Sequence, residues 1–358
     1  MKKFRNSNID ILKAISAYLV CYSHFNNSVK VGYEYWLSLE GMIGYMLLAV
    51  SSMAVPLFLM INGYLVINKV YSYDEYVKKA IKIILITTVW CILYNIIFSC
   101  FFREGKKVSD ILYAVYNGIY TGEYISIRNW FFYALSVCYL LSPLIKKVFE
   151  SDNKNLIKYM FFLPAIYIWG NDLWQKIILL VGYQGRITEV FPRTNIFDAW
   201  DSFALLYYLF GGILYKYAWG EENRIKKLIL AAVSLFIIWG YGILYVYKNK
   251  IFYNIVWGGY PSCFLFAASG LLAAVLINYR GRISNVIKFL GERIAGNTFG
   301  IYFVHLLIGS FFKPYYVERI RDDSLFGGIV YASLVFAISY FVTDFIKKVP
   351  VLKRIVTL

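Results

Sequence analysis

The chain has 358 residues, of which 60% are apolar and only 16% charged, against about 25% charged residues in an average soluble domain. This composition argues against a soluble protein, a disordered chain and a collagen-like fibre. The five cysteines lie inside apolar stretches, without the paired spacing of a disulfide framework or a metal site. Because the net charge is +16, the placement of the charges must decide whether nucleic acid is a partner.

Apolar stretches of about 17 to 25 residues are long enough to cross a bilayer as helices. Ten such stretches occur, at 9–28, 41–67, 81–102, 129–146, 156–172, 199–218, 228–247, 260–279, 295–312 and 327–346. We therefore expect an all-α integral membrane protein, a polytopic bundle of about ten transmembrane helices that forms a single domain over residues 1–358. The partly apolar stretch 173–181 leaves the count uncertain by one, because a re-entrant or interfacial helix there is also compatible with the sequence.

The charges follow the expected membrane topology. With the N-terminus inside, the cytoplasmic segments carry 23 lysines and arginines against 7 acidic residues, and the outer segments carry 13 against 12. This distribution satisfies the positive-inside rule, so we expect both termini in the cytoplasm. Orientation and attraction to anionic lipid headgroups account for the excess. No DNA- or RNA-binding motif accompanies it, so no nucleic-acid partner is expected.

Polar groups inside the spans are the candidates for chemistry, since an ionisable residue in hydrocarbon costs at least about 2.5 to 3.5 kcal/mol. The first span carries Asp10, Lys13 and His24. Asp10 and Lys13 are one helical turn apart and are placed to form an ion pair near the cytoplasmic interface. His24 follows Asp10 by about 21 Å of helix, in the outer half of the membrane, and shares a helix face with Lys13.

The chain has only two histidines, His24 and His305, and both fall inside predicted spans. Two histidines are too few for a tetrahedral all-histidine metal site, and the cysteines supply no completing pattern, so we expect no metal. A lone histidine on an apolar helix is more often a packing residue than a catalyst. Proton transfer is the chemistry for which a single imidazole suffices, because an imidazole titrates near neutral pH.

Five segments carry a recognisable pattern. The first span reads R-x(4)-D-x-x-[RK]-x(10)-H from Arg5 to His24. The other four are AVPLFLMINGYLV with Asn62, YVKKAIKIILITTVW with Lys79 and Lys82, NWFFYALSVCYLLSPLI with Trp130, and GNTFGIYFVH with His305. In this order they resemble the membrane-bound acyltransferase-3 family, bacterial enzymes that acylate surface glycans. The likeness is to the stand-alone branch, without a fused SGNH hydrolase-like domain.

The sequence departs from the family pattern at four positions. Lys79 and Lys82 stand where the family has the two arginines of an R-x-x-R motif, and Lys13 replaces the usual arginine. Asn62 takes the place of a serine. Lysine keeps the positive charge but cannot form the planar bidentate fork of arginine.

The resemblance implies transfer of an acyl group, by default acetyl, from cytoplasmic acyl-CoA to a hydroxyl of a surface polysaccharide or lipid-linked glycan, in the bacterial cytoplasmic membrane. Acyl-CoA is then a donor substrate, and no bound cofactor is expected. His24 is the expected catalytic base. Lys79 and Lys82 are expected to hold the CoA phosphates, and the remaining substrate-binding residues are Asp10, Lys13, Asn62, Trp130 and His305.

Alternatives remain open at this point. Direct transfer and a covalent acyl-histidine both fit the pattern. An exporter of glycans or lipid-linked oligosaccharides would place the same polar groups along a path, although no internal repeat of the kind found in many transporters is visible. A structural membrane scaffold would not explain why ionisable residues occupy positions 10, 24 and 82.

Overall fold

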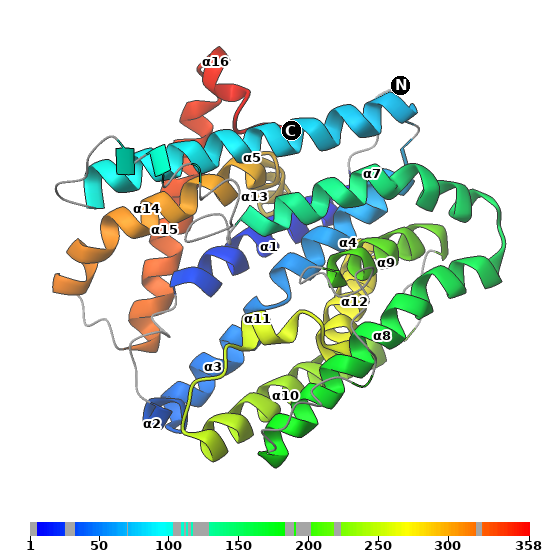
Figure 1. Ribbon diagram of the computed structural model, residues 1–358, viewed down its shortest axis with the longest axis horizontal. Helices are drawn as coiled ribbons and strands as arrows, with labels where there is room; N and C mark the ends of the chain where they lie inside the picture. Colours follow the sequence, from blue (N-terminus) through cyan, green and yellow to red (C-terminus); the bar gives the residue numbers. More distant parts are fainter. Residues whose placement is uncertain are drawn as a thin grey trace.

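The computed structural model describes residues 6–25, 33–69, 71–102, 109–110, 112–113, 116, 129–182, 190, 202–217, 223–319 and 324–358. These residues form helices joined by short connections, with no strand among them (Figure 1). The helices are α1 (Ser7–Phe25), α2 (Tyr33–Trp36), α3 (Leu39–Ser51), α4 (Ala54–Ile67), α5 (Tyr73–Phe102), α7 (Trp130–Glu150), α8 (Lys154–Val181), α9 (Phe203–Tyr217), α10 (Arg224–Asn249), α11 (Ile255–Gly259), α12 (Cys263–Ile277), α13 (Asn285–Ala295), α14 (Thr298–Arg319), α15 (Leu325–Ile346) and α16 (Pro350–Lys353).

Every predicted span overlaps a helix or a pair of consecutive helices, and the all-helical fold is confirmed for the described part of the chain. Among the described helices, five are long and apolar enough to cross a membrane, or six when the bent pair α13 and α14 counts as one span. The number ten therefore stays a prediction. The stretch 173–181 is neither a separate span nor a re-entrant helix, because α8 continues without a break through these residues to Val181.

Glycine allows α4 and α9 to pack with their backbones in contact. A Cβ atom at Gly63 would collide with the backbone carbonyl of Tyr208, and one at Gly211 would collide with that of Met60. Small residues at such crossings are typical of membrane helices, where close packing replaces the hydrophobic effect as the source of association. The requirement for glycine at position 63 fixes the depth and rotation of the neighbouring Asn62.

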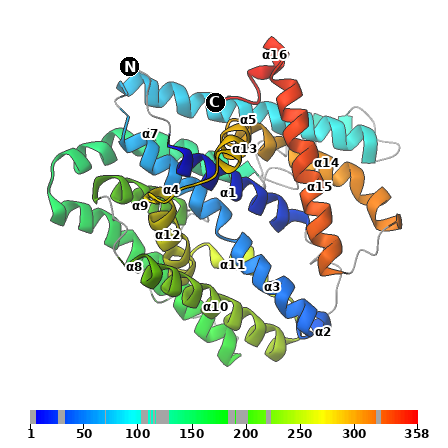
Figure 2. The same cartoon turned by 180° about the vertical axis from the view of Figure 1, so that it is seen from behind.

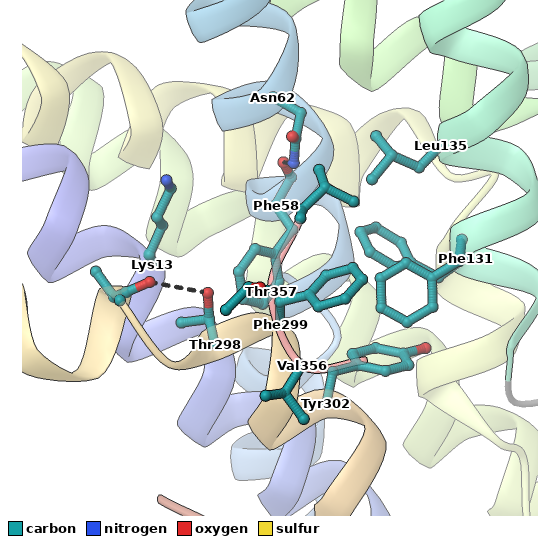
Figure 3. Close-up of a pocket in the computed structure, with 14 residues that line it drawn as sticks. Lys13, Phe58, Asn62, Phe131, Leu135, Thr298, Phe299, Tyr302, Val356 and Thr357 are labelled. Atoms are coloured by element: carbon teal, nitrogen blue, oxygen red, sulfur yellow. Dashed lines mark hydrogen bonds between the residues drawn. The ribbon is translucent and has the colours of Figure 1, made fainter. Parts of the chain in front are cut away.

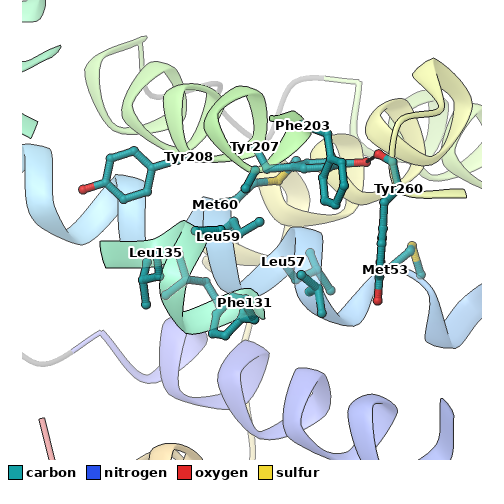
Figure 4. Packing of buried hydrophobic residues seen from close by; sticks show 14 of the residues in the cluster. Met53, Leu57, Leu59, Met60, Phe131, Leu135, Phe203, Tyr207, Tyr208 and Tyr260 are labelled. Carbon is teal, nitrogen blue, oxygen red and sulfur yellow. Dashed lines mark hydrogen bonds between the residues drawn. The ribbon is translucent and has the colours of Figure 1, made fainter. Parts of the chain in front are cut away.

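The core between α4, α7 and α9 combines aromatic rings with leucine and methionine side chains (Figure 4). Tyr207 and Tyr208 are fully buried, and each satisfies its hydroxyl within the bundle. Tyr207 donates to the carbonyl oxygen of Tyr260 at 2.8 Å, and the hydroxyl of Tyr208 lies 2.7 Å from that of Ser142. Pairing of this kind is required because an unsatisfied hydroxyl in an apolar interior is costly.

The beginning of α1 and the end of α15 both lie beside α13 (Figure 2). Gly291 of α13 packs against Ile11 of α1. Lys347, directly after α15, donates to the carbonyl oxygen of Gly296 and, at 2.5 Å, to Oδ1 of Asn297, at the break where α13 and α14 meet with a bend of 73°. The beginning of α1 and the end of α15 are therefore on the same side of the bundle. The assignment of that side to the cytoplasm stays a prediction.

Candidate active site

The two histidines of the chain lie against each other. His24 is at the end of α1 and His305 is in α14, and their ring centroids are 5.4 Å apart. His305 is completely buried, and its Nδ1 lies 3.1 Å from the carbonyl oxygen of Ile301, one turn earlier in the helix. His24 is half-buried. The more accessible imidazole is therefore the one that the sequence predicted as the base.

A cavity of about 390 Å³ opens inside the bundle, bounded by α1, α4, α7, the beginning of α14 and residues 356–358 (Figure 3). Its volume lies in the range of about 300 to 1,000 Å³ that is typical of small-molecule sites. Lys13 and Asn62, both predicted to bind substrate, are among its lining residues. Much of the remaining wall is aromatic, from Phe58, Phe131, Phe132, Phe299 and Tyr302.

Two helices, α1 and α14, carry both residues that line the cavity and the two histidines. Lys13 and His24 are eleven residues apart on α1, which is about three turns and about 16 Å along one helix face. On α14, Tyr302 lines the cavity and its ring centroid is 5.7 Å from that of His305. A molecule that enters at Lys13 and extends along this face would point its far end toward the histidines.

A second cationic position lies near the start of α5. The ammonium group of Lys79 is 3.8 Å from the ring centroid of Tyr71 and also donates to the Tyr71 hydroxyl. Lys69 lies 5.7 Å from the same ring. Burial alone would raise the pKa of the Tyr71 hydroxyl, but hydrogen bonds from Lys79 and Lys69 and the charges of both lysines lower it below its ordinary value. Two cations thus converge on one tyrosine.

This cationic position is connected to the cavity through a tyrosine of α7. Lys79 lies 5.9 Å from the ring centroid of Tyr139, whose hydroxyl is 3.5 Å from Oδ1 of Asn62. Lys82 is exposed on α5, and neither Lys79 nor Lys82 is among the residues that line the cavity. The second lysine near Tyr71 is Lys69 rather than Lys82. The family pattern in the sequence did not single out Lys69.

Two other predicted substrate-binding residues lie outside the cavity wall. Trp130 is buried and packs against Phe203, Trp257 and Tyr260, with ring centroids 5.5, 6.1 and 5.6 Å away. Trp130 therefore packs behind the cavity wall, against Phe131, which lines the cavity. Asp10 is 7% exposed, on the same helix as Lys13.

Several residues of the site were not predicted from the sequence. Tyr302 belongs to the segment that matched the family pattern at His305, yet only the histidine was chosen. Val356 lies beyond the last predicted span, yet it is 1% exposed, packs against the bundle and lines the cavity. The carbonyl oxygen of Ile355 accepts a hydrogen bond of 2.7 Å from the Trp90 indole, an interaction that hydropathy cannot reveal. Among the described residues, no group of three or more histidine, cysteine or acidic side chains is arranged to hold a metal ion.

Comparison with protein families adds the decisive observation. A family model described as an acyltransferase domain, that of acyltransferase-3, matches residues 6–346. The chain belongs to the acyltransferase-3 family. No curated protein and no solved structure matches the chain.

Family membership gives the class of reaction, which is acyl transfer. The apolar helices make this acyltransferase-3 protein a multi-pass membrane protein. The matched range contains both histidines, Lys13 and Asn62, whereas the part of the cavity wall at residues 356–358 lies beyond it.

Proposed function

We propose that the protein transfers an acetyl group from cytoplasmic acetyl-CoA to a hydroxyl of a surface polysaccharide or lipid-linked glycan, in the cytoplasmic membrane. Acetyl-CoA is a substrate in this proposal, and no bound cofactor takes part. The other partners are the lipids of the bilayer, with no role for nucleic acid. What supports the proposal is the family, together with a cavity lined by Lys13 and by Tyr302, whose ring contacts His305.

The donor binds from the cytoplasmic side. The nucleotide phosphates of CoA are held by Lys79, which converges with Lys69 on Tyr71, while Lys82 attracts the anion from its exposed position. Lys13 contacts the donor inside the cavity. Its positive charge attracts the anionic donor more strongly there than in water, because the surroundings are apolar. The pantetheine arm lies among the aromatic rings, and the thioester points toward His24.

The acceptor hydroxyl approaches His24 from the outer side of the membrane. The neutral imidazole takes the hydroxyl proton while the oxygen attacks the thioester carbonyl carbon. The C–S bond breaks, the ester C–O bond forms, and the thiolate of CoA receives the proton that His24 carries. Acetyl-CoA and the glycan hydroxyl thus become an acetyl ester and CoA with a free thiol, without oxidation or reduction.

His305 orients the base. Its imidazole faces His24 at a centroid distance of 5.4 Å and is tied to its own helix through Nδ1. A completely buried group of this kind keeps one orientation, so His24 is held in a fixed position relative to the end of the cavity. His305 therefore acts through His24, and its loss should reduce the reaction less than the loss of His24.

The observation that carries the proposal is the contact between the rings of His24 and His305, next to Tyr302, which lines the cavity. Purified protein in lipid nanodiscs, given acetyl-CoA and the glycan fraction of a strain that lacks the gene, should release free CoA thiol and acetylate the glycan. A His24→Ala variant is the matched control. If the wild-type protein consumes no acetyl-CoA but moves the glycan across a sealed vesicle membrane, it is an exporter and the proposal is wrong.

A further inference from the structure

Tyr302 lines the cavity and also contacts one ring of the histidine pair. Its ring lines the cavity on one side and meets the His305 ring edge-to-face at 5.7 Å on the other. Neither His24 nor His305 is among the lining residues. Along α14, the route from the cavity to the histidine pair therefore passes Tyr302.

A second ring stands beside Tyr302 at this point. Phe131 of α7 also lines the cavity, and it stacks on Tyr302 with a centroid distance of 5.5 Å and an interplanar angle of 30°. Phe132 holds Tyr302 from the side, edge-to-face at 4.7 Å. Closely packed rings have little freedom to rotate, because interiors of proteins are as dense as molecular crystals. Figure 3 shows the rings of Phe131 and Tyr302 close together.

We propose that Tyr302, together with Phe131, determines which acyl groups the enzyme transfers, by admitting short unbranched chains to the histidine pair and excluding longer ones. This inference rests on the proposed function and adds the size limit of the acyl group. Each extra methylene has to displace a ring that is packed on two sides. A hydrophobic site discriminates by about 10- to 200-fold for one methylene.

The neighbouring residue Phe299 provides a control within the same helix. It lies one turn before Tyr302 and also lines the cavity, but its ring contacts are with Phe132 and Phe303. Shortening Phe299 enlarges the cavity but leaves in place the Tyr302 ring that contacts His305. A size limit set by the whole cavity would respond to both positions, whereas a limit set at Tyr302 responds to one.

The test compares kcat/KM for acetyl-CoA, butyryl-CoA and hexanoyl-CoA, with the full chain in nanodiscs and the unacylated glycan fraction as acceptor. The Tyr302→Ala variant should raise the ratio of butyryl to acetyl transfer by about tenfold or more. Tyr302→Phe, which keeps the ring, and Phe299→Ala should leave this ratio within twofold of the wild-type value. The milder variants Tyr302→Leu and Phe131→Leu should raise it in the same direction, and they provide the test if Tyr302→Ala does not fold.

The outcomes separate this inference from the proposed function. Wild-type protein that releases no CoA thiol from any of the three donors would overturn both. Transfer that depends on His24, with an unchanged donor ratio in folded Tyr302→Ala, Tyr302→Leu and Phe131→Leu variants, would overturn the size limit alone. An equal change of the ratio in Phe299→Ala would assign selectivity to the cavity as a whole and would also overturn it.

Discussion

The imidazole rings of His24 and His305 lie 5.4 Å apart, although they come from opposite ends of the chain. This contact joins the first span to one of the last and places the only two histidines of the chain at one point. Each ring also packs against Phe25, at centroid distances of 6.4 and 6.2 Å. Two groups in such contact are expected to act as a unit, so their substitutions should not have additive effects.

The His305→Gln variant should retain partial activity, because glutamine keeps one hydrogen-bond donor and one acceptor. His305→Ala should lose more. In the double variant with His24→Ala, the second substitution should cost little beyond the first. Turnover of acetyl-CoA by the wild type, the three single variants and the double variant, at equal amounts in the membrane, measures this. A loss in His305→Gln as complete as in His24→Ala would mean that both imidazoles take part directly in proton transfer.

Charge reversal near the start of α5 tests the binding of CoA. Lys79→Glu should raise the apparent KM for acetyl-CoA strongly and leave that for the glycan unchanged, since Lys79 meets Lys69 at Tyr71. Lys82→Glu should have a smaller effect because Lys82 is exposed. Lys78→Glu, an exposed neighbour on the same helix, is the control. Equal KM values in all three variants would make these lysines ordinary anchors at the membrane surface.

The sequence predicted the general architecture well, because apolar stretches and their flanking charges report directly which residues enter a bilayer. Each of the ten predicted ranges overlaps a helix in its described residues, and the family is confirmed over residues 6–346. Hydropathy does not report which helices are neighbours. The contact of His24 with His305 and the approach of Lys69 to Tyr71 depend on helix packing, so neither was predicted.

Aromatic residues show the same limitation. The place of Trp36 just before a predicted span is typical of an aromatic belt at the membrane interface. In the structure, however, it is 2% exposed and packs against Tyr45 and Phe252. A tryptophan at a span end has the same sequence signal whether it faces lipid headgroups or a neighbouring helix. Trp130 likewise matched the family pattern, but a linear motif gives no rotation about the helix axis, and its ring lies behind the cavity wall rather than in it.

Helix packing at Gly63 gives a test of the fold. Gly63→Ala should destabilise the protein by about 1 to 3 kcal/mol, because the added methyl group meets the backbone of Tyr208 and forces α4 and α9 apart. Gly240→Ala, in α10, is the control: a Cβ atom there has nothing within 4 Å, so alanine should be neutral or stabilising. Thermal unfolding in one detergent measures both. Equal melting temperatures for the two variants would contradict the close crossing of α4 and α9.

The topology is tested by reporters fused after Leu358. The sequence predicts a cytoplasmic C-terminus from Lys347, Lys348, Lys353 and Arg354, and the structure places the end of α15 on the same side as the beginning of α1. A reporter that is active only in the cytoplasm should therefore be active when fused after Leu358. Activity of an exclusively extracytoplasmic reporter at this position would contradict the predicted orientation.

The most direct test of the account is acetyl transfer by the His24→Ala variant. General-base catalysis contributes about 10²- to 10⁴-fold, so turnover should fall by a factor in that range while binding of acetyl-CoA is retained. The wild-type rate should also fall as the medium becomes acidic enough to protonate imidazole, since only the neutral ring accepts a proton. A variant that is present in the membrane at the wild-type level and still acetylates the glycan at nearly the wild-type rate would contradict the assignment of His24 as the base.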